Sequence, residues 1–193
     1  MAEPAAQLRM TLDQFLAWDD GTDALYELVE GEVVAMAAPR DAHGTIVMNL
    51  GLAIAPGLKQ PCRVVGNAGI VLPGRADRYY VADLVVTCDG PANQRPFLPE
   101  PRLIVEVLSR STAAHDRGRK GEDYRQLSSV REILFVSSDE RRVLLWRRAT
   151  GHWIIEDFIG DALVHLTSVE ARIPLSVIYS NVAFDEPYEE DAG

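Results

Sequence analysis

The chain has 193 residues, of which 47% are apolar and 25% are charged, as expected for one globular domain with a substantial core. No apolar run reaches the roughly 18 residues that a membrane helix needs, and the first residues lack the pattern of a secretory signal. These features exclude a membrane-spanning protein and predict a cytoplasmic one, in which Cys62 and Cys88 are expected to be reduced thiols.

The net charge of −10 is concentrated at the two ends of the chain. Residues 1–32 contain eight acidic side chains and one basic one, and residues 173–193 contain five acidic side chains and no base. The remaining 16 acids and 18 bases lie between these ends, so charge neither supports nor excludes a polyanionic substrate. We expect a disordered N-terminus over 1–9, a single domain over 10–180 and an acidic tail over 181–193.

The first elements predicted in chain order are a short helix, a hairpin and a longer helix. Thr11 and Gln14 form a capping-box pattern, which predicts that a helix begins there. Apolar residues over 25–29 and 32–36 flank a Glu30-Gly31 turn and predict a β-hairpin. The next helix is expected over 42–55, with Asp41 as its N-cap.

Beyond this helix the pattern is dominated by strands. Short segments rich in Val, Ile and Leu predict strands over 63–65, 69–72, 81–88 and 102–109, and an antiparallel meander over 132–137, 143–148 and 153–159. A further helix is expected over 116–127, and a strand or short helix over 173–179. The sequence therefore predicts one α+β domain with a mostly antiparallel sheet flanked by helices.

Three carboxylates interrupt apolar strand faces. Successive strand residues face opposite sides of a sheet, so Glu106 lies on one face with Ile104 and Leu108, although both faces of 102–109 are apolar. Asp83 lies in the same way between Val81 and Val85, and Glu27 between Leu25 and Val29.

A lysine shows the same behaviour on the helix expected over 116–127. Of the 19 basic residues, 17 are arginines, and Lys120 is one of only two lysines. Helical spacing places Lys120 on the inward face with Tyr124 and Leu127, whereas Arg119, Glu122, Asp123 and Gln126 are expected to face solvent.

The joint occurrence of three such acids and one inward lysine indicates a shared site as one of two interpretations. Charged side chains are almost never fully buried unless they are paired, and clustered acids need a cation. Mg²⁺ is suited to such a site because it takes oxygen ligands and leaves positions open for water or phosphate. The alternative is that each acid is structural, at a sheet edge or hydrogen-bonded to a loop amide. His43 is expected at the rim of the site, and His152 and His165 are expected in solvent.

Six segments, in order, resemble the Uma-two-type family of restriction-endonuclease-like proteins, which belongs to the PD-(D/E)xK nuclease superfamily. They are Tyr26-Glu-Leu-Val-Glu-Gly-Glu32, Pro39-x-x-x-His43, Ala82-Asp-Leu-Val-Val86, Leu103-Ile-Val-Glu-Val-Leu-Ser109, Asp116-Arg-x-x-Lys120-x-x-x-Tyr124 and Val130-Arg-Glu-Ile-Leu-Phe-Val136. The resemblance covers roughly 10–180 and implies a restriction-endonuclease-like core. It makes Asp83 and Glu106 the two motif acids and Glu27 the additional upstream acid. The superfamily's usual lysine position holds Leu108, and the resemblance moves that lysine to Lys120.

The resemblance also implies an activity. It predicts an endonuclease that hydrolyses phosphodiester bonds of DNA with Mg²⁺ or Mn²⁺, held by Asp83, Glu106, the carbonyl of Val107 and Glu27, while Lys120 acts on the attacking water. The substrate contacts that it implies are His43, Ser109, Arg110, Arg117, Arg119 and Tyr124. It further implies a homodimer. A catalytically silent nuclease-fold module for interaction or oligomerisation is the alternative, and RNA, branched DNA or single-stranded DNA stays open as a substrate.

Overall fold

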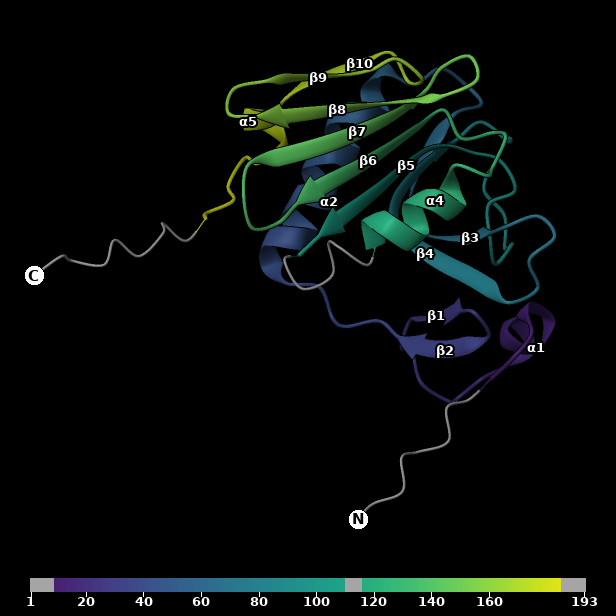
Figure 1. The fold of residues 1–193 in the computed structure, drawn as a ribbon. Coiled ribbons are helices and arrows are strands. Elements are labelled where there is room, and N and C mark those ends of the chain that lie inside the picture. The colour runs from purple at the N-terminus through teal and green to yellow at the C-terminus, as the bar shows by residue number, and fades with distance from the viewer. Residues whose placement is uncertain (1–8, 110–115, 185–193) are drawn as a thin grey trace, which may run out of the picture.

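The computed structural model describes residues 9–109 and 116–184, which form a large mixed sheet with helices on both faces and a second, two-stranded sheet (Figure 1). The elements are α1 (Leu12–Ala17), β1 (Tyr26–Val29), β2 (Glu32–Ala35), α2 (Asp41–Ile54), η1 (Ala55–Gly57), β3 (Arg63–Val71), β4 (Arg78–Thr87), β5 (Pro101–Leu108), η2 (Asp116–Lys120), α4 (Gly121–Tyr124), β6 (Glu132–Ser137), β7 (Arg142–Arg148), β8 (Trp153–Ile159), β9 (Leu163–Leu166), β10 (Ala171–Pro174) and α5 (Leu175–Ile178).

The sheet confirms the predicted fold class. Its strand order is β2-β1-β4-β5-β6-β7-β8, with β3 paired to β4, and β9 and β10 form a separate two-stranded sheet. Within the large sheet only β5 and β6 pair in parallel, and the meander from β6 to β8 is antiparallel as expected. A mostly antiparallel sheet flanked by helices is the α+β arrangement that the sequence predicts.

Both faces of strand β5 are covered by other parts of the protein, so β5 lies in the interior of the fold. Leu103, Val105 and Val107 belong to one buried cluster, which α2 covers with Ile46, Leu50 and Ile54. Ile104 and Leu108 belong to a second cluster on the opposite face, which contains Tyr124 and Leu127 of the α4 segment. Figure 1 shows α2 and α4 on opposite sides of the sheet.

The edge of β4 positions the candidate site. Strand β3 pairs with β4 from Tyr79 to Thr87 and so occupies one edge of β4. Strands β1 and β5 must therefore share the other edge, where β1 pairs at Arg78 and Tyr79 and β5 pairs from Leu84 onward. The stretch of this edge between β1 and β5 carries no ladder pairing.

Several boundaries differ from the prediction. The capping box at Thr11 is confirmed, but α2 begins at Asp41 itself with Arg40 as N-cap, so Asp41 is a first-turn residue and not the cap. The two strands expected over 63–65 and 69–72 are one continuous strand, β3. The region expected over 173–179 is divided between the end of β10 and α5.

Cys62 and Cys88 form a disulfide, so the expectation of two reduced thiols is wrong. Cys62 directly precedes β3 and Cys88 directly follows β4, and the pairing of Arg63 with Thr87 places the two cysteines opposite each other. Their Cα atoms are 3.9 Å apart. The 26-residue spacing gives no sign of this pairing, which depends on the register of two long strands.

A buried carboxylate at the start of β6 ties the large sheet to the turn between β9 and β10. Glu132 is fully buried and accepts hydrogen bonds from Arg147 Nε at 2.9 Å and from the backbone N–H and hydroxyl groups of Thr167 and Ser168. Burial alone would raise the pKa of Glu132, but these hydrogen bonds outweigh it and lower the pKa below 4.5.

The Glu132→Gln variant should therefore be destabilised by about 3 kcal/mol at pH 7, because its amide group would face N–H and O–H donors and Arg147 would keep only Glu156 as an ionic partner among the described residues. A carboxyl whose folded-state pKa is lowered stabilises the protein above its unfolded pKa, and this stabilisation is lost as the pH falls through the folded value. Urea unfolding at pH 7 and at acidic pH should show the gap between wild type and variant closing as the pH falls below 4.5. A gap that does not change with pH would contradict this role.

Candidate active site

Asp83 and Glu106 face each other where the ladder between β4 and β5 opens. The last pair of this ladder is Leu84 with Val105, and the same register makes Asp83 and Glu106 the next pair. Asp83 Oδ2 accepts a hydrogen bond of 2.7 Å from the backbone N–H of Val107. A side-chain carboxylate thus takes the place of a strand–strand hydrogen bond, which holds Asp83 against β5.

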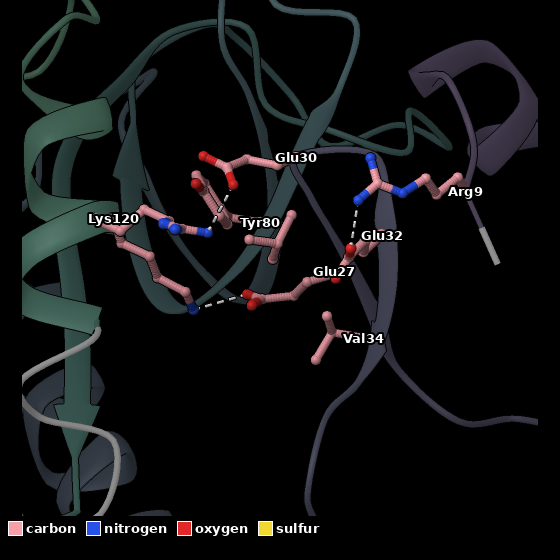
Figure 2. A pocket seen from close by; sticks show the side chains of 9 residues that line it. Arg9, Glu27, Glu30, Glu32, Val34, Tyr80 and Lys120 are labelled. Carbon is pink, nitrogen blue, oxygen red and sulfur yellow. Dashed lines mark hydrogen bonds and ion pairs between the residues drawn. The ribbon is translucent and has the colours of Figure 1, made fainter. Parts of the chain in front are cut away.

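Glu27 and Lys120 close the gap between β1 and β5. Glu27 Oε1 accepts hydrogen bonds from Lys120 Nζ at 2.7 Å and from the backbone N–H of Val81 at 2.9 Å. Lys120 Nζ also lies 3.6 Å from Glu106 Oε1 and 5.7 Å from the ring centre of Tyr80. Figure 2 shows Lys120 reaching from its helix toward Glu27 on the hairpin. The four charged residues found on apolar faces therefore lie together.

A close helix–sheet contact brings Lys120 to this position. Gly121 follows Lys120, and a Cβ atom built on Gly121 would lie 2.8 Å from the ring of Trp146 and 3.1 Å from that of Phe135. Only glycine lets the helix approach the sheet so closely. Replacement of Gly121 would push the helix outward and carry Lys120 away from Glu27.

Glu106 is the most strongly perturbed carboxyl of the site. It is 3% exposed, and Tyr124 Oη donates a hydrogen bond of 2.6 Å to its Oε1. Burial, aided by the charges of Asp83 and Glu27 and opposed by Lys120 and Tyr124, raises the pKa of Glu106 to about 8. Burial and the charge of Glu106 also raise the pKa of Tyr124 well above its usual range. A raised pKa on a carboxyl beside a specific cation is typical of functional sites.

His43 reaches the same centre from the first turn of α2. Its Nε2 lies 3.2 Å from Asp83 Oδ2, and its Nδ1 is buried without a hydrogen-bond partner among the residues that the structure describes. His43 thus lies at the site as expected. His152 and His165 are exposed, also as expected.

Three of the other residues expected to bind substrate line two separate cavities. Tyr124 contacts Glu106, and Arg119 lines a cavity of about 370 Å³ beside Glu27 and Lys120. Ser109 and Arg117 instead line a second cavity of about 280 Å³ near the ends of β5 and β6. Arg110 lies outside the described residues.

Asp123 is buried, so the expectation that it faces solvent is wrong. It is 3% exposed and forms an ion pair with Arg78, and Tyr80 Oη donates a hydrogen bond of 2.6 Å to its Oδ2. Burial and this hydrogen bond raise the pKa of Tyr80. Asp123 follows Lys120 by three residues, a spacing at which helical side chains share a face, and this was the available signal. Nothing in the sequence marks Arg78 as its partner.

The oxygens of the site suit a hard divalent cation. The contacts of Asp83 use its Oδ2 and those of Glu106 use its Oε1, and within 9–109 and 116–184 no hydrogen bond reaches the second oxygen of either carboxylate. In the same residues, no three side chains of His, Cys, Asp or Glu are grouped closely enough to hold a metal. Mg²⁺ nevertheless needs only one or two carboxylates, because water completes its coordination. Asp83 and Glu106 therefore fit a site in which two carboxylates bind the cation. Glu27 is not counted among these ligands, because its carboxylate is already paired with Lys120.

The mixed sheet carries Asp83 and Glu106 at the open end of the β4–β5 ladder, with Lys120 beside Glu106. This arrangement is typical of a restriction-endonuclease-like protein. A family model described as "Uma2: Putative restriction endonuclease" matches residues 12–177, and the chain belongs to this family. The expected family is thereby confirmed.

Among the helices that the structure describes, none has the length and apolar character needed to span a membrane.

Two further proteins and one solved structure are similar to this chain. The "Uncharacterized protein slr1290" of Synechocystis is 28% identical over 180 residues, which is 91% of this chain and 94% of that protein. The "Uncharacterized protein sll1609" of the same organism is 23% identical over 158 residues, or 79% and 89% of the two chains. A crystal structure from Anabaena variabilis, described as a putative nuclease belonging to DUF820, superposes with a TM-score of 0.69 at 20% identity, over 89% of this chain and 98% of that one. At this identity the superposition shows a shared fold.

Proposed function

We propose that the protein is a metal-dependent endonuclease that hydrolyses phosphodiester bonds of DNA. The observation that carries the proposal is the meeting of Asp83 and Glu106 at the open end of the β4–β5 ladder, with Lys120 Nζ 3.6 Å from Glu106. Membership of a family named for restriction endonucleases supports this reading. Fold alone would not, because one fold hosts many functions.

The two ladder carboxylates would hold the cation. Asp83 and Glu106 each have an oxygen that accepts no hydrogen bond from the described residues, and the carbonyl of Val107, whose N–H donates to Asp83, is the third candidate ligand. When bound, Mg²⁺ or Mn²⁺ lowers the pKa of a water molecule and neutralises charge on the scissile phosphate. Tyr124 fixes Glu106 through its 2.6 Å hydrogen bond, and His43 contacts Asp83 from the other side.

Lys120 acts on the attacking water. Glu27 bonds both Lys120 and the backbone of β4, so the ammonium group is fixed relative to the two acids. Its N–H groups would orient the water, and its positive charge would stabilise the hydroxide that forms as the proton of that water passes to bulk solvent. Such fixed charges stabilise a transition state without reorganisation. Glu27 is in this scheme a positioning residue for Lys120.

The test is metal-dependent cleavage by the purified protein. Supercoiled plasmid and single-stranded oligonucleotides should be nicked or cut in millimolar Mg²⁺ or Mn²⁺, and should stay intact with a chelator. Mn²⁺ at about 100 times its dissociation constant should also stabilise the protein by about 2.7 kcal/mol, measured by chemical unfolding. Cleavage that persists in chelator would overturn the mechanism. If neither cleavage nor a response to metal is seen, the silent interaction module is the correct reading.

A further inference from the structure

A cavity of about 370 Å³ adjoins the proposed catalytic centre and shares Glu27 and Lys120 with it. One wall is a single face of the β1–β2 hairpin, because the pairs Glu27–Val34 and Val29–Glu32 place these four side chains on one side. The other side is formed by Lys120, Arg119 and the Tyr80 ring (Figure 2). The volume lies within the roughly 300–1,000 Å³ typical of small-molecule sites.

The charges around this cavity balance. Glu27 pairs with Lys120, Glu32 pairs with Arg9 at 2.7 Å, and Glu30 pairs with Arg119 at 3.4 Å. Three carboxylates against three cations give no net attraction for a phosphate chain. The cavity is therefore unsuited to the sugar–phosphate backbone as such.

The same walls suit a nucleobase. Val29 and Val34 offer apolar surface to the face of a flat ring, and Val34 is 44% exposed. Glutamate oxygens accept hydrogen bonds from the exocyclic amino groups of bases, as in the contact of Glu or Asp with cytosine N4. Thymine lacks such an amino group.

The turn that carries Glu30 is held in an uncommon conformation. Glu30 has a φ of +55°, and Gly31, beside it, has a φ of +83°. Glutamate is rarely found at such angles, where Gly, Asn and Asp are preferred. This conformation directs the Glu30 carboxylate to Arg119, which lines the cavity, and to the buried Arg78 behind it.

We infer that this cavity receives one unpaired, amino-bearing base of the DNA strand next to the scissile phosphate. The inference rests on the proposed function and names its substrate class, which is single-stranded or locally unpaired DNA. A base inside a duplex is stacked and paired, so it can enter such a pocket only after it leaves the helix. Arg119 and Arg9 at the rim are then placed to exchange their glutamate partners for the adjoining phosphates.

Binding without turnover tests this inference separately from catalysis. The Glu106→Gln variant keeps every residue that lines the cavity, and fluorescence anisotropy gives its affinity for labelled oligonucleotides in Ca²⁺. We expect a single strand and a duplex with one unpaired cytosine to bind at least 10-fold more tightly than the matched full duplex. Oligo-dC and oligo-dA should bind more tightly than oligo-dT.

A cavity-filling variant completes the test. Adding Val34→Trp should abolish the preference for unpaired bases and leave the melting temperature unchanged, because Val34 is partly exposed. Ile155→Trp on β8, which is 57% exposed and far from the hairpin in Figure 1, is the matched control and should keep the preference. Equal affinity for all oligonucleotides, or a preference that survives in Val34→Trp, would overturn the inference. Neither result depends on whether the wild type cleaves DNA, so failure here is distinct from failure of the proposed function.

Discussion

DNA cleavage by the Glu106→Gln variant is expected to fall by roughly 10³-fold or more. The substitution keeps the shape of the side chain but removes a charge that would hold the metal, and losses of this size follow the removal of one fixed electrostatic group. Asp83→Asn and Lys120→Met should cause losses of similar order. The measurement is the initial rate of plasmid nicking in Mn²⁺ at equal protein concentration.

Glu122→Gln is the control for this series. Glu122 lies two residues from Lys120 on the same helical segment, but its side chain is 69% exposed and pairs only with Arg125 among the described residues. Its rate should equal that of the wild type. Activity that survives in Glu106→Gln would show that the cleavage came from a contaminating enzyme, and the catalytic assignment would fail.

A second large effect is expected on the stability of the metal-free protein as a function of pH. Glu106 has a pKa of about 8 in the folded state, against 4.5 for the free side chain. Between these values the folded state keeps the proton and the unfolded state has lost it, so the free energy of unfolding must fall as the pH rises. Over the whole window this loss amounts to at most about 5 kcal/mol.

The Glu106→Gln variant isolates this contribution. With a chelator present, urea unfolding between pH 4.5 and 8 should show the wild type losing stability relative to the variant as the pH rises. Mn²⁺ should restore the wild type at high pH, because it binds the ionised carboxylate, and should act much less on the variant. Parallel pH curves for the two proteins would mean that Glu106 is not perturbed by burial, and that the acids are structural.

Alternation along single strands was sufficient to predict much of the fold and the core of the site. The two apolar faces of 102–109 predicted a strand covered on both sides, and β5 does contribute to two separate clusters. The same alternation identifies Asp83, Glu106 and Glu27 as charged side chains on apolar strand faces. Helical spacing identifies Lys120 as a charged side chain on an inward helix face. Their assembly is long-range, since Glu27 and Lys120 are 93 residues apart, and here the family resemblance supplied the order of the segments.

Local helix geometry explains the main error within the site. The face of Asp123 was deduced from the spacing of a regular α-helix over 116–127. The structure has a π-helix over Asp116–Lys120 and an α-helix only over Gly121–Tyr124. In the α-helix that follows, Asp123 lies three residues after Lys120 and directly before Tyr124, so it borders the inward face that these two residues define. Asp123 thereby turns inward to Arg78, whose position on β4 no local pattern connects with it.

The two acids of the ladder differ in how the fold depends on them. Asp83 replaces a hydrogen bond of the sheet through the Val107 N–H, so loss of its side chain leaves a buried donor without a partner, at a cost of about 1–3 kcal/mol. Glu106 satisfies no backbone group in the described hydrogen bonds, and its hydrogen-bond and ion-pair partners among the described residues are Tyr124 and Lys120. Glu106→Gln is for this reason the better choice when an inactive but intact protein is needed.

This difference also has an evolutionary consequence. A lineage released from selection on the site would tend to lose Glu106 early, because at neutral pH the fold gains from that loss once no metal is supplied. It would keep Asp83 for longer, since Asp83 also serves the sheet. Among descendants of such a lineage, a retained Asp83 would record ancestry, whereas a retained Glu106 would indicate that the chemistry is still in use.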